Sequence, residues 1–586
     1  MSGTTGSIPT LKGRDGWAKE PREKANLLKY AFTEKYAVPQ LSVNQFSEVV
    51  PVSSTLDCGD ITEEMAFELL SSLRVDSATG PDGLPARILR GVARELAAPV
   101  AMIAARILAC GRWPEDWRIH WIVALHKRKS VYDPDNYRGV HLTTHISKVT
   151  ERIFARLLHP FLEPLDLFGS NQFAYTSKRG ARDAVAFLML TWIGIVNKGG
   201  KVGVFCSDVQ GAFDRVRYDR LAIKLQRSGI PAPLVAVLVS WLESRRAQVL
   251  VEGQFSDEAT LHNMVFQGTV LGPPLWNLFF KDADRAIRAS TFREVVYADD
   301  LNAFKEFDAS TDNDSIWTSC TSCQKNLHEW GAANAVTFDP GKESMHVLSR
   351  TDAAGESFKL LGVTFDPQLR MEECVASTST EAAWKIDVIL RTRHYHSVPE
   401  LIHLYKSQVL SYIEYRTPAV YHACSTFLER VDRQQRRFLR ALDLSEEQAL
   451  SEYRLAPLCA RRDMAMLGFI HRTVLGQGPS HFRTFFRLSE CENRRQITRS
   501  DQKRHHRQLV DPRDGSQTAF LSRSALGLIG VYNLLPSHIV EEASVSVFQG
   551  ALQGLLLHRM SANHDCWQSL FSPRQPMYSH PLRGYQ

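Results

Sequence analysis

The sequence has no cysteine framework and no long hydrophobic run. Its 10 cysteines are scattered over 586 residues, and the one close pair, Cys320 and Cys323, has no second pair at zinc-finger spacing. The longest apolar stretch, 184–196, is too short to cross a bilayer, and residues 1–10 lack the basic and apolar regions of a signal peptide. We therefore expect a soluble, intracellular protein without membrane contact, in a reducing compartment.

The sequence also lacks internal repeats, low-complexity tracts and a strong excess of charge of one sign. The net charge is +6, and the hydrophobic and charged fractions, 44% and 23%, are ordinary for a globular protein. A chain of this length needs more than one core, and about three to four domains are expected. Basic side chains concentrate late in the chain, after about residue 430, which matters more than the total charge.

Two carboxylate positions carry the strongest chemical signal. Asp208 ends the run Val202-Gly203-Val204-Phe205-Cys206-Ser207, and the pair Asp299-Asp300 follows Val295-Val296-Tyr297-Ala298. Such β-branched and aromatic runs predict buried strands, where acidic residues are costly unless they are paired or bind metal. Two strand-end carboxylate positions could share a pair of divalent cations, an arrangement that suits in-line phosphoryl or nucleotidyl transfer.

Strands alternate with helices through the first two thirds of the chain. The patterns predict strands that end near residues 125 and 208, a hairpin around 299–300 and several intervening helices, among them 181–196 and 315–332. Antiparallel hairpins within this alternation favour an α+β palm over a doubly wound sheet. From about residue 381 onward the pattern is nearly all helical.

Six ordered segments carry a family resemblance. They are Thr79-Gly80-Pro81-Asp82-Gly83, Asn136-Tyr137-Arg138, Asp208 with Ala212-Phe213-Asp214, Gln267-Gly268 through Pro273, Tyr297-Ala298-Asp299-Asp300, and Phe358 through Val363. Together they resemble the reverse transcriptases of non-LTR (LINE-like, jockey-like) retroelements, over about residues 56–560. The resemblance implies an α+β right-hand polymerase, with fingers, palm and thumb and a mostly α-helical C-terminal extension.

The resemblance implies a division of the chain into five parts. In order these are a loosely ordered N-terminal extension (1–55), fingers with N-terminal helices (56–200), a palm with the catalytic carboxylates (201–365), a thumb (366–450) and a helical basic C-terminal region (451–586).

The implied activity is RNA-directed DNA polymerase, a nucleotidyltransferase that extends a DNA or RNA primer with dNTPs on an RNA template. Asp208 and Asp299 would be the principal metal ligands, with Asp300 beside them, for two Mg²⁺ ions that Mn²⁺ could replace. One ion would lower the pKa of the primer hydroxyl and the other would bind the triphosphate. The alternative is that these are ordinary strand-end carboxylates.

The resemblance also implies nucleotide-binding residues. Lys127 and Arg138 would hold the triphosphate, although Arg128 or Lys129 could take the place of Lys127, and the alternative is a solvated basic loop. Phe213 would block a ribose 2′-OH, or else be a core aromatic. The segment with Gln267 and Gly268 faces template and nucleotide, and Lys342 would protonate the leaving pyrophosphate. Asp214 is interpreted as a surface or structural residue.

Nucleic-acid contacts are expected after the palm. Gly362 lies in the primer-grip segment, and one predicted helix presents a row of arginines, followed later by a second basic cluster at 494–508. The alternative for each cluster is a solvated helix face. The helix residues are Arg433, Arg436, Arg437 and Arg440.

Some family features are absent from the sequence. Gly272-Pro273 stands where the family has Ser-Pro, and we find no endonuclease domain, zinc knuckle or RNase H carboxylate set. Mobility would therefore require an endonuclease in trans, unless the chain is a fragment or relic of a longer polyprotein, and location in the nucleus or cytoplasm stays open. Two rival functions are kept: a catalytically silent, retroelement-derived nucleic-acid-binding protein, and an RNA-dependent RNA polymerase.

Overall fold

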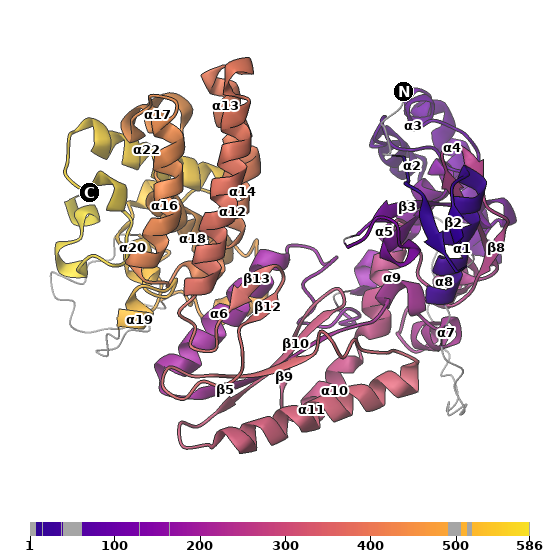
Figure 1. Cartoon of the computed structure of the whole chain (residues 1–586), viewed down its shortest axis with the longest axis horizontal. Coiled ribbons are helices and arrows are strands. Elements are labelled where there is room, and N and C mark those ends of the chain that lie inside the picture. Colours follow the sequence, from indigo (N-terminus) through magenta and orange to yellow (C-terminus); the bar gives the residue numbers. More distant parts are fainter. Residues whose placement is uncertain are drawn as a thin grey trace. The chain divides into compact units, whose positions relative to one another are not determined.

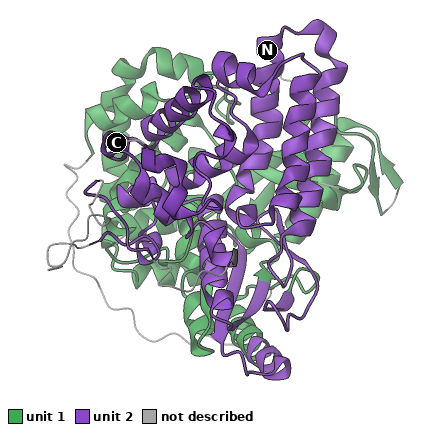
Figure 2. Cartoon of the chain, turned by 90° about the vertical axis from the view of Figure 1, so that its left-hand side faces the viewer, with its two compact units in different colours: residues 1–175, 207–294, 322–343 green, residues 176–206, 295–321, 344–586 purple. Residues whose placement is uncertain are grey.

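The computed structural model describes residues 7–14, 16–36, 38, 61–127, 129–162, 164–489, 505–511 and 519–584. The chain divides into two compact units, coloured separately in Figure 2. Unit 1 comprises 1–175, 207–294 and 322–343, and unit 2 comprises 176–206, 295–321 and 344–586. The chain therefore passes between the units after residues 175, 206, 294, 321 and 343.

Unit 1 contains a sheet in the order β4-β3-β6-β7, with β8 also paired to β6. β3 is antiparallel to β4 and parallel to β6, and β6 is antiparallel to β7 and β8. The strands are β3 (Ile119–His126), β4 (Tyr137–Leu142), β6 (Arg245–Val251), β7 (Gln254–Phe255) and β8 (Ala259–Leu261).

Helices account for most of the rest of unit 1. α2 begins after Thr62, whose side chain accepts the Met65 N–H, and α4 ends at Gly111 in the left-handed region, both strong helix boundaries. The helices are α1 (Pro21–Lys35), α2 (Glu63–Ser71), α3 (Ala86–Gly91), α4 (Ala93–Cys110), α5 (His145–Leu162), η4 (Ala212–Arg215), α7 (Tyr218–Gln226), α8 (Ala232–Leu242), α9 (Gly272–Phe280) and α10 (Ala283–Ala289).

The structure differs from the sequence interpretation over residues 11–35, which were expected to be loosely ordered. β1 (Leu11–Gly13) and β2 (Gly16–Ala18) form a hairpin, and α1 follows. α1 begins with a capping box between Glu20 and Glu23 and buries Leu28 and Phe32. This amphipathic, capped helix explains the order, which the mixed composition of the segment concealed.

Unit 2 contains a sheet in the order β11-β5-β10-β9. A few residues at the strand ends belong to unit 1 instead: Ser207, Asp208, Arg293 and Glu294. β5 is buried along nearly its whole length, as its apolar run predicted, and Trp192 of α6 (Ala181–Asn197) packs edge-on against Phe304 of β10. The strands are β5 (Lys201–Asp208), β9 (Arg293–Tyr297), β10 (Asp300–Phe307) and β11 (Ser344–Leu348), with the separate hairpin β12 (Phe358–Leu360) and β13 (Val363–Phe365).

The remainder of unit 2 is helical, as predicted, and α12 and α16 lie side by side (Figure 1). Asp432 of α16 forms a two-contact ion pair with Arg462 of α18, at 2.6 and 2.8 Å, which joins these two helices. The helices are α12 (Glu372–Arg391), α13 (Val398–Leu404), η6 (Tyr405–Leu410), α14 (Ser411–Tyr415), α15 (Thr417–Val420), α16 (Ser425–Arg440), α17 (Glu446–Tyr453), α18 (Leu458–Val474), α19 (Ala519–Ser522), α20 (Leu528–Leu534), α21 (Ser537–Val540) and α22 (Val545–Ser561). α11 (Asn313–Asn334) is shared by the two units.

Candidate active site

Asp208, the first candidate metal ligand, is held against Lys342 in unit 1. The Asp339 N–H donates to the Asp208 carbonyl oxygen at 3.0 Å, and a β-bridge joins Val209 to Phe338. These contacts hold the turn that follows Phe338, so that the Lys342 ammonium forms an ion pair with the Asp208 carboxylate. The Asp208 side chain is only 13% exposed, and a positive charge therefore balances a largely buried carboxylate.

Glu343 forms a second anchor beside this pair. Its side chain, 7% exposed, accepts the Ser207 hydroxyl at 2.9 Å and the Gln324 amide at 2.8 Å, and it contacts the His328 ring nitrogen at 2.8 Å. This network fixes the backbone on both sides of the Asp208–Lys342 pair. The sequence analysis missed Glu343, although an acid directly after Lys342 was an available signal.

The predicted nucleotide-binding side chains of unit 1 meet around Asp214. The Gln267 amide donates to the Asp214 carboxylate at 3.0 Å. Burial raises the pKa of Asp214 to about 6, while Lys127 and Arg138 oppose that rise. Burial, with Arg138 next in importance, lowers the pKa of Lys127. Asp214 thus has the structural role that the sequence suggested, and it organises the candidate triphosphate site; Arg128 lies outside the described residues.

Gly268 lies where only glycine fits well. Its φ is +96°, and a Cβ there would approach the His141 carbonyl oxygen to 2.9 Å. The His141 N–H donates to the Gln267 carbonyl oxygen at 2.8 Å. The turn that carries Gln267 is therefore pressed against β4, the strand that carries Arg138.

The same turn is anchored from its other side by Glu151 of α5. One Glu151 oxygen accepts the Val270 N–H at 2.7 Å and the Leu271 N–H at 3.3 Å. Burial raises the pKa of Glu151, and the fully buried Arg245 opposes this. The sequence analysis did not find this residue, because 119 positions separate Glu151 from Val270 and no local pattern links them.

Phe213, the candidate ribose gate, lies between two aromatic rings. Its ring stacks on Trp276 at 5.7 Å and meets Tyr175 edge-on at 6.0 Å. The side chain is half-buried. A rigid, partly accessible aromatic face suits a steric gate, and the same contacts suit a core residue.

The twin aspartates lie in unit 2 at the tight turn between β9 and β10. Ala298 has a φ of 59°, in the left-handed region that non-glycine residues rarely adopt. Asp299 and Asp300 are half-buried, and Asp300 is one of the charges that raise the pKa of Cys206, after the larger effect of burial. Cys206 lies on β5, the sheet neighbour of β10 and two residues before Asp208. Across the described part of the chain, no cluster of three or more His, Cys, Asp or Glu side chains forms a ready metal cage.

Gly362, the predicted primer-grip residue, forms the tip of the β12–β13 hairpin with Leu361. Both residues have positive φ, 77° and 48°, as a type I′ turn requires. The Tyr415 hydroxyl donates to the Leu361 carbonyl oxygen at 2.7 Å, and Arg416 donates to the Gly362 carbonyl oxygen at 3.2 Å. Helix α14 therefore fixes the tip of this hairpin within unit 2.

The predicted basic face of α16 is partly neutralised. Arg437 pairs with Asp387 at 2.7 Å, while Arg433 and Arg436 both approach Glu429, Arg433 at 3.6 Å. Arg440 donates to the Arg436 carbonyl oxygen at 3.4 Å. Nucleic-acid contact by these arginines stays a prediction, and most of the 494–508 cluster lies outside the described residues.

Comparison with known proteins identifies the central part of the chain. A family model described as "Reverse transcriptase (RNA-dependent DNA polymerase)" matches residues 125–365. The matched residues include Lys127, Arg138, Asp214, Gln267 and both carboxylate positions.

Two similar proteins are RNA-directed DNA polymerases of Drosophila mobile elements. "RNA-directed DNA polymerase from mobile element jockey" of Drosophila melanogaster is 25% identical over 461 residues, 73% of this chain and 49% of the relative. "Probable RNA-directed DNA polymerase from transposon BS" of the same species is 27% identical over 296 residues, 48% of this chain and 33% of the relative. The chain thus spans half or less of the length of these relatives.

A solved structure of apo telomerase from Candida tropicalis is similar at 10% identity, with a TM-score of 0.33 over 49% of this chain and 61% of the other. The match to the reverse transcriptase family model over residues 125–365 and the mixture of helices and sheets confirm the predicted α+β right-hand polymerase class. Among the described helices, none has the length and apolar character needed to span a bilayer.

Proposed function

We propose that this chain is the RNA-directed DNA polymerase of a non-LTR retroelement, which extends a primer 3′-OH with dNTPs on an RNA template. The observation that carries the proposal is the gathering of Lys127, Arg138 and Gln267 around Asp214, six residues after the Asp208 carboxylate. Phosphate-binding cations beside a carboxylate suited to metal binding are what nucleotidyl transfer requires.

The carboxylates of the site are donors of the kind that divalent cations prefer. Asp208 offers hard oxygen donors. In the structure the positive charge of the Lys342 ammonium balances this carboxylate. Asp208, Asp299 and Asp300 would hold two Mg²⁺ ions, or Mn²⁺ in their place. When bound, such ions activate the attacking hydroxyl and stabilise the charge on the phosphates.

The other residues have separate tasks in this proposal. Arg138 and Lys127 bind the triphosphate, the former through a fork of donors and the latter as a point charge. Gln267, held by Asp214, orients the nucleotide against the turn at Gly268. Lys342 leaves Asp208 to protonate the departing pyrophosphate, because an ammonium is a suitable general acid. Phe213 blocks a ribose 2′-OH.

The larger setting is also proposed. Gly362 and the α16 arginines contact the template–primer, and the fingers, palm, thumb and C-terminal region follow the bounds given above. Mobility would use an endonuclease in trans. The protein would act inside the cell, in the nucleus or the cytoplasm.

Primer extension on an RNA template tests the activity. The experiment compares the wild-type chain with the Asp299→Asn, Asp300→Asn variant, in dNTPs with Mg²⁺ or Mn²⁺. We expect the wild type to extend the primer and the variant to be slower by at least about a thousandfold, because several kcal/mol of transition-state stabilisation are lost.

Template–primer binding by both proteins is the control. Equal binding with extension only by the wild type would support the proposal. If neither extends the primer and both bind, the protein is instead a catalytically silent nucleic-acid-binding protein. Extension with ribonucleotides in preference to dNTPs would favour the RNA-dependent RNA polymerase.

A further inference from the structure

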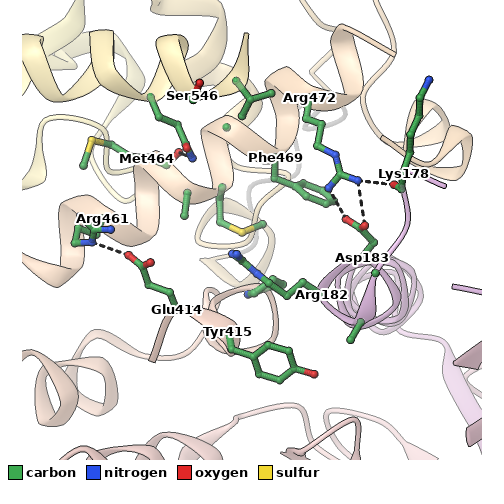
Figure 3. A pocket seen from close by; sticks show the side chains of 18 of the residues that line it. Lys178, Arg182, Asp183, Glu414, Tyr415, Arg461, Met464, Phe469, Arg472 and Ser546 are labelled. Carbon is green, nitrogen blue, oxygen red and sulfur yellow. Dashed lines mark hydrogen bonds and ion pairs between the residues drawn. The ribbon is translucent and has the colours of Figure 1, made fainter. Parts of the chain in front are cut away.

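A cavity of about 920 Å³ lies within unit 2, outside the carboxylate site. Its wall comes from the segment that leads into α6 and from α14, α18 and α22 (Figure 3). The volume is at the upper end of the range for ligand pockets. It is large enough for a few nucleotides and too small for a duplex.

The wall carries more positive than negative charge. Its cations are Lys178, Arg179, Arg182, Arg461 and Arg472, and its acids are Asp183 and Glu414. Both acids are already engaged: Arg472 contacts Asp183 at 2.9 and 3.1 Å, and Arg461 contacts Glu414 at 2.6 Å. Five cations against two acids leave an excess of three positive charges for an incoming anion.

Lys178 and Arg182 are the most available of these cations. Both side chains are exposed, and neither has an acidic partner in the part of the chain that the structure describes. Figure 3 shows Arg182 extending from α6 into the space bounded by Tyr415 and Phe469. A guanidinium and an ammonium at one opening suit phosphodiester groups.

The opposite wall has an open position that packing does not explain. Gly550 lies inside α22, where glycine costs roughly 1 kcal/mol relative to alanine, and a Cβ there would meet no atom within 4 Å. Gly468 of α18, in contrast, is contacted closely by Gln549. The clearance at Gly550 therefore leaves room for an occupant, and half-buried Phe469 and Tyr415 supply aromatic surface nearby.

We propose that this cavity binds a single-stranded segment of nucleic acid, at a site separate from the template–primer. The inference rests on the proposed polymerase function, which brings single-stranded template to the protein. Excess cations with aromatic side chains are the usual surface for single strands. The size of the cavity argues against a duplex.

Binding of a second strand tests the site. The full chain is first saturated with an unlabelled blunt template–primer duplex, and a fluorescent 12-nucleotide oligouridylate is then titrated by anisotropy. Lys178→Ala with Arg182→Ala should weaken the oligonucleotide about tenfold, as expected for the loss of two charged contacts. The slope of log K against log salt should fall by about 1.4, or 0.7 per lost phosphate contact.

Two further variants make the result specific. Arg106→Ala with Arg112→Ala removes the same charge from exposed positions at the end of α4 and should leave the affinity unchanged. Gly550→Leu keeps the charge and fills the cavity, and it should weaken the oligonucleotide as strongly as the double alanine variant.

Primer extension on a template–primer whose primer 3′ end is recessed should be unchanged in all three variants. This result separates the single-strand proposal from the polymerase proposal. Equal oligonucleotide affinity in wild type, the double alanine variant and Gly550→Leu would overturn the single-strand site. So would displacement of the oligonucleotide by inorganic tripolyphosphate at the same phosphate concentration, because the cavity would then be a site for small anions.

Discussion

Phe213 combines packing with a candidate role in selectivity. Its ring is clamped by Trp276 and Tyr175, so it cannot easily move away from an added hydroxyl group. A clamped aromatic face is a hard steric barrier, whereas a merely apolar pocket discriminates weakly against a hydroxyl.

Phe213→Ala should therefore admit ribonucleotides. We expect the ratio of kcat/KM for dNTP over kcat/KM for NTP to fall by about tenfold or more, because the steric barrier to the 2′-OH is removed. Single-nucleotide incorporation with matched dNTP and NTP measures the ratio. Trp276→Phe, which keeps an aromatic support, is the control, and an unchanged ratio in Phe213→Ala would assign Phe213 to the core alone.

Asp214 shows how far individual residues can be interpreted from the sequence. The motif around Asp208 indicated the strand, the carboxylate and the following aromatic residue. It did not indicate that Asp214 would bond Gln267 and lie beside Lys127 and Arg138, because those contacts join three separate segments. The α16 arginines were predicted as a basic face, but their acidic neighbours Glu429 and Asp387 bring ion pairs that composition alone does not reveal.

At the scale of elements, helix α5 supports the turn that precedes α9. Glu151 provides one carboxylate oxygen for two backbone N–H groups of that turn, and Arg245 offers the nearby positive charge. A buried charge in such a position is strongly destabilising when its partner is lost.

Glu151→Ala should raise the KM for dNTP more than it lowers kcat, because the turn that carries Gln267 and Gly268 loses its anchor. The Tm should also fall, since a buried network is broken. Glu151→Gln retains an acceptor oxygen and should recover much of the KM. Steady-state primer extension and thermal melts measure both effects; equal KM values in all three proteins would exclude the anchoring role.

The hairpin of β12 and β13 is a second supported element. Its tip depends on the Tyr415 hydroxyl and on Arg416, and the φ values of Leu361 and Gly362 were not predictable from a motif written as Leu-Gly. The sequence analysis placed Gly362 in the primer-grip segment and left the hairpin and its support from α14, about fifty residues later, unknown.

Tyr415→Phe should weaken template–primer binding about fivefold, since one hydrogen bond contributes about 1 kcal/mol. The matched control is Tyr412→Phe, whose ring keeps its position over Arg416 at 3.9 Å. Anisotropy with a labelled template–primer measures the affinity. A loss of affinity in the control as large as in Tyr415→Phe would assign the effect to the helix rather than to the hairpin.

At the scale of the whole molecule, buried histidines bear on the expected response to mild acid. Burial lowers the pKa of eight histidines, while it raises the pKa of Asp214 and Asp463 to about 6, an effect of the opposite sign on stability. The histidines are His120, His141, His145, His346, His422, His471, His505 and His580.

The Tm should therefore fall as the pH is lowered from 7 to 5. Below about pH 6.5 the unfolded chain binds protons that the folded histidines exclude, so the free energy of unfolding decreases with falling pH. Carboxyl groups with a raised pKa bind protons in the folded state and offset only part of this loss; besides Asp214 and Asp463 they are Glu151, Asp284 and Glu446. Differential scanning fluorimetry across the range measures it; a Tm that rises toward pH 5 would show that the carboxyl groups dominate.

The interleaving of the two units has a consequence for the synthesis of the protein. Unit 1 needs residues up to 343, and unit 2 uses segments from 176 to the C-terminal end. A ribosome that stops before residue 343 leaves both units without part of their chain. A break in the chain at any point between residues 176 and 343 therefore leaves neither unit whole, because unit 1 extends to residue 343 and unit 2 begins at residue 176.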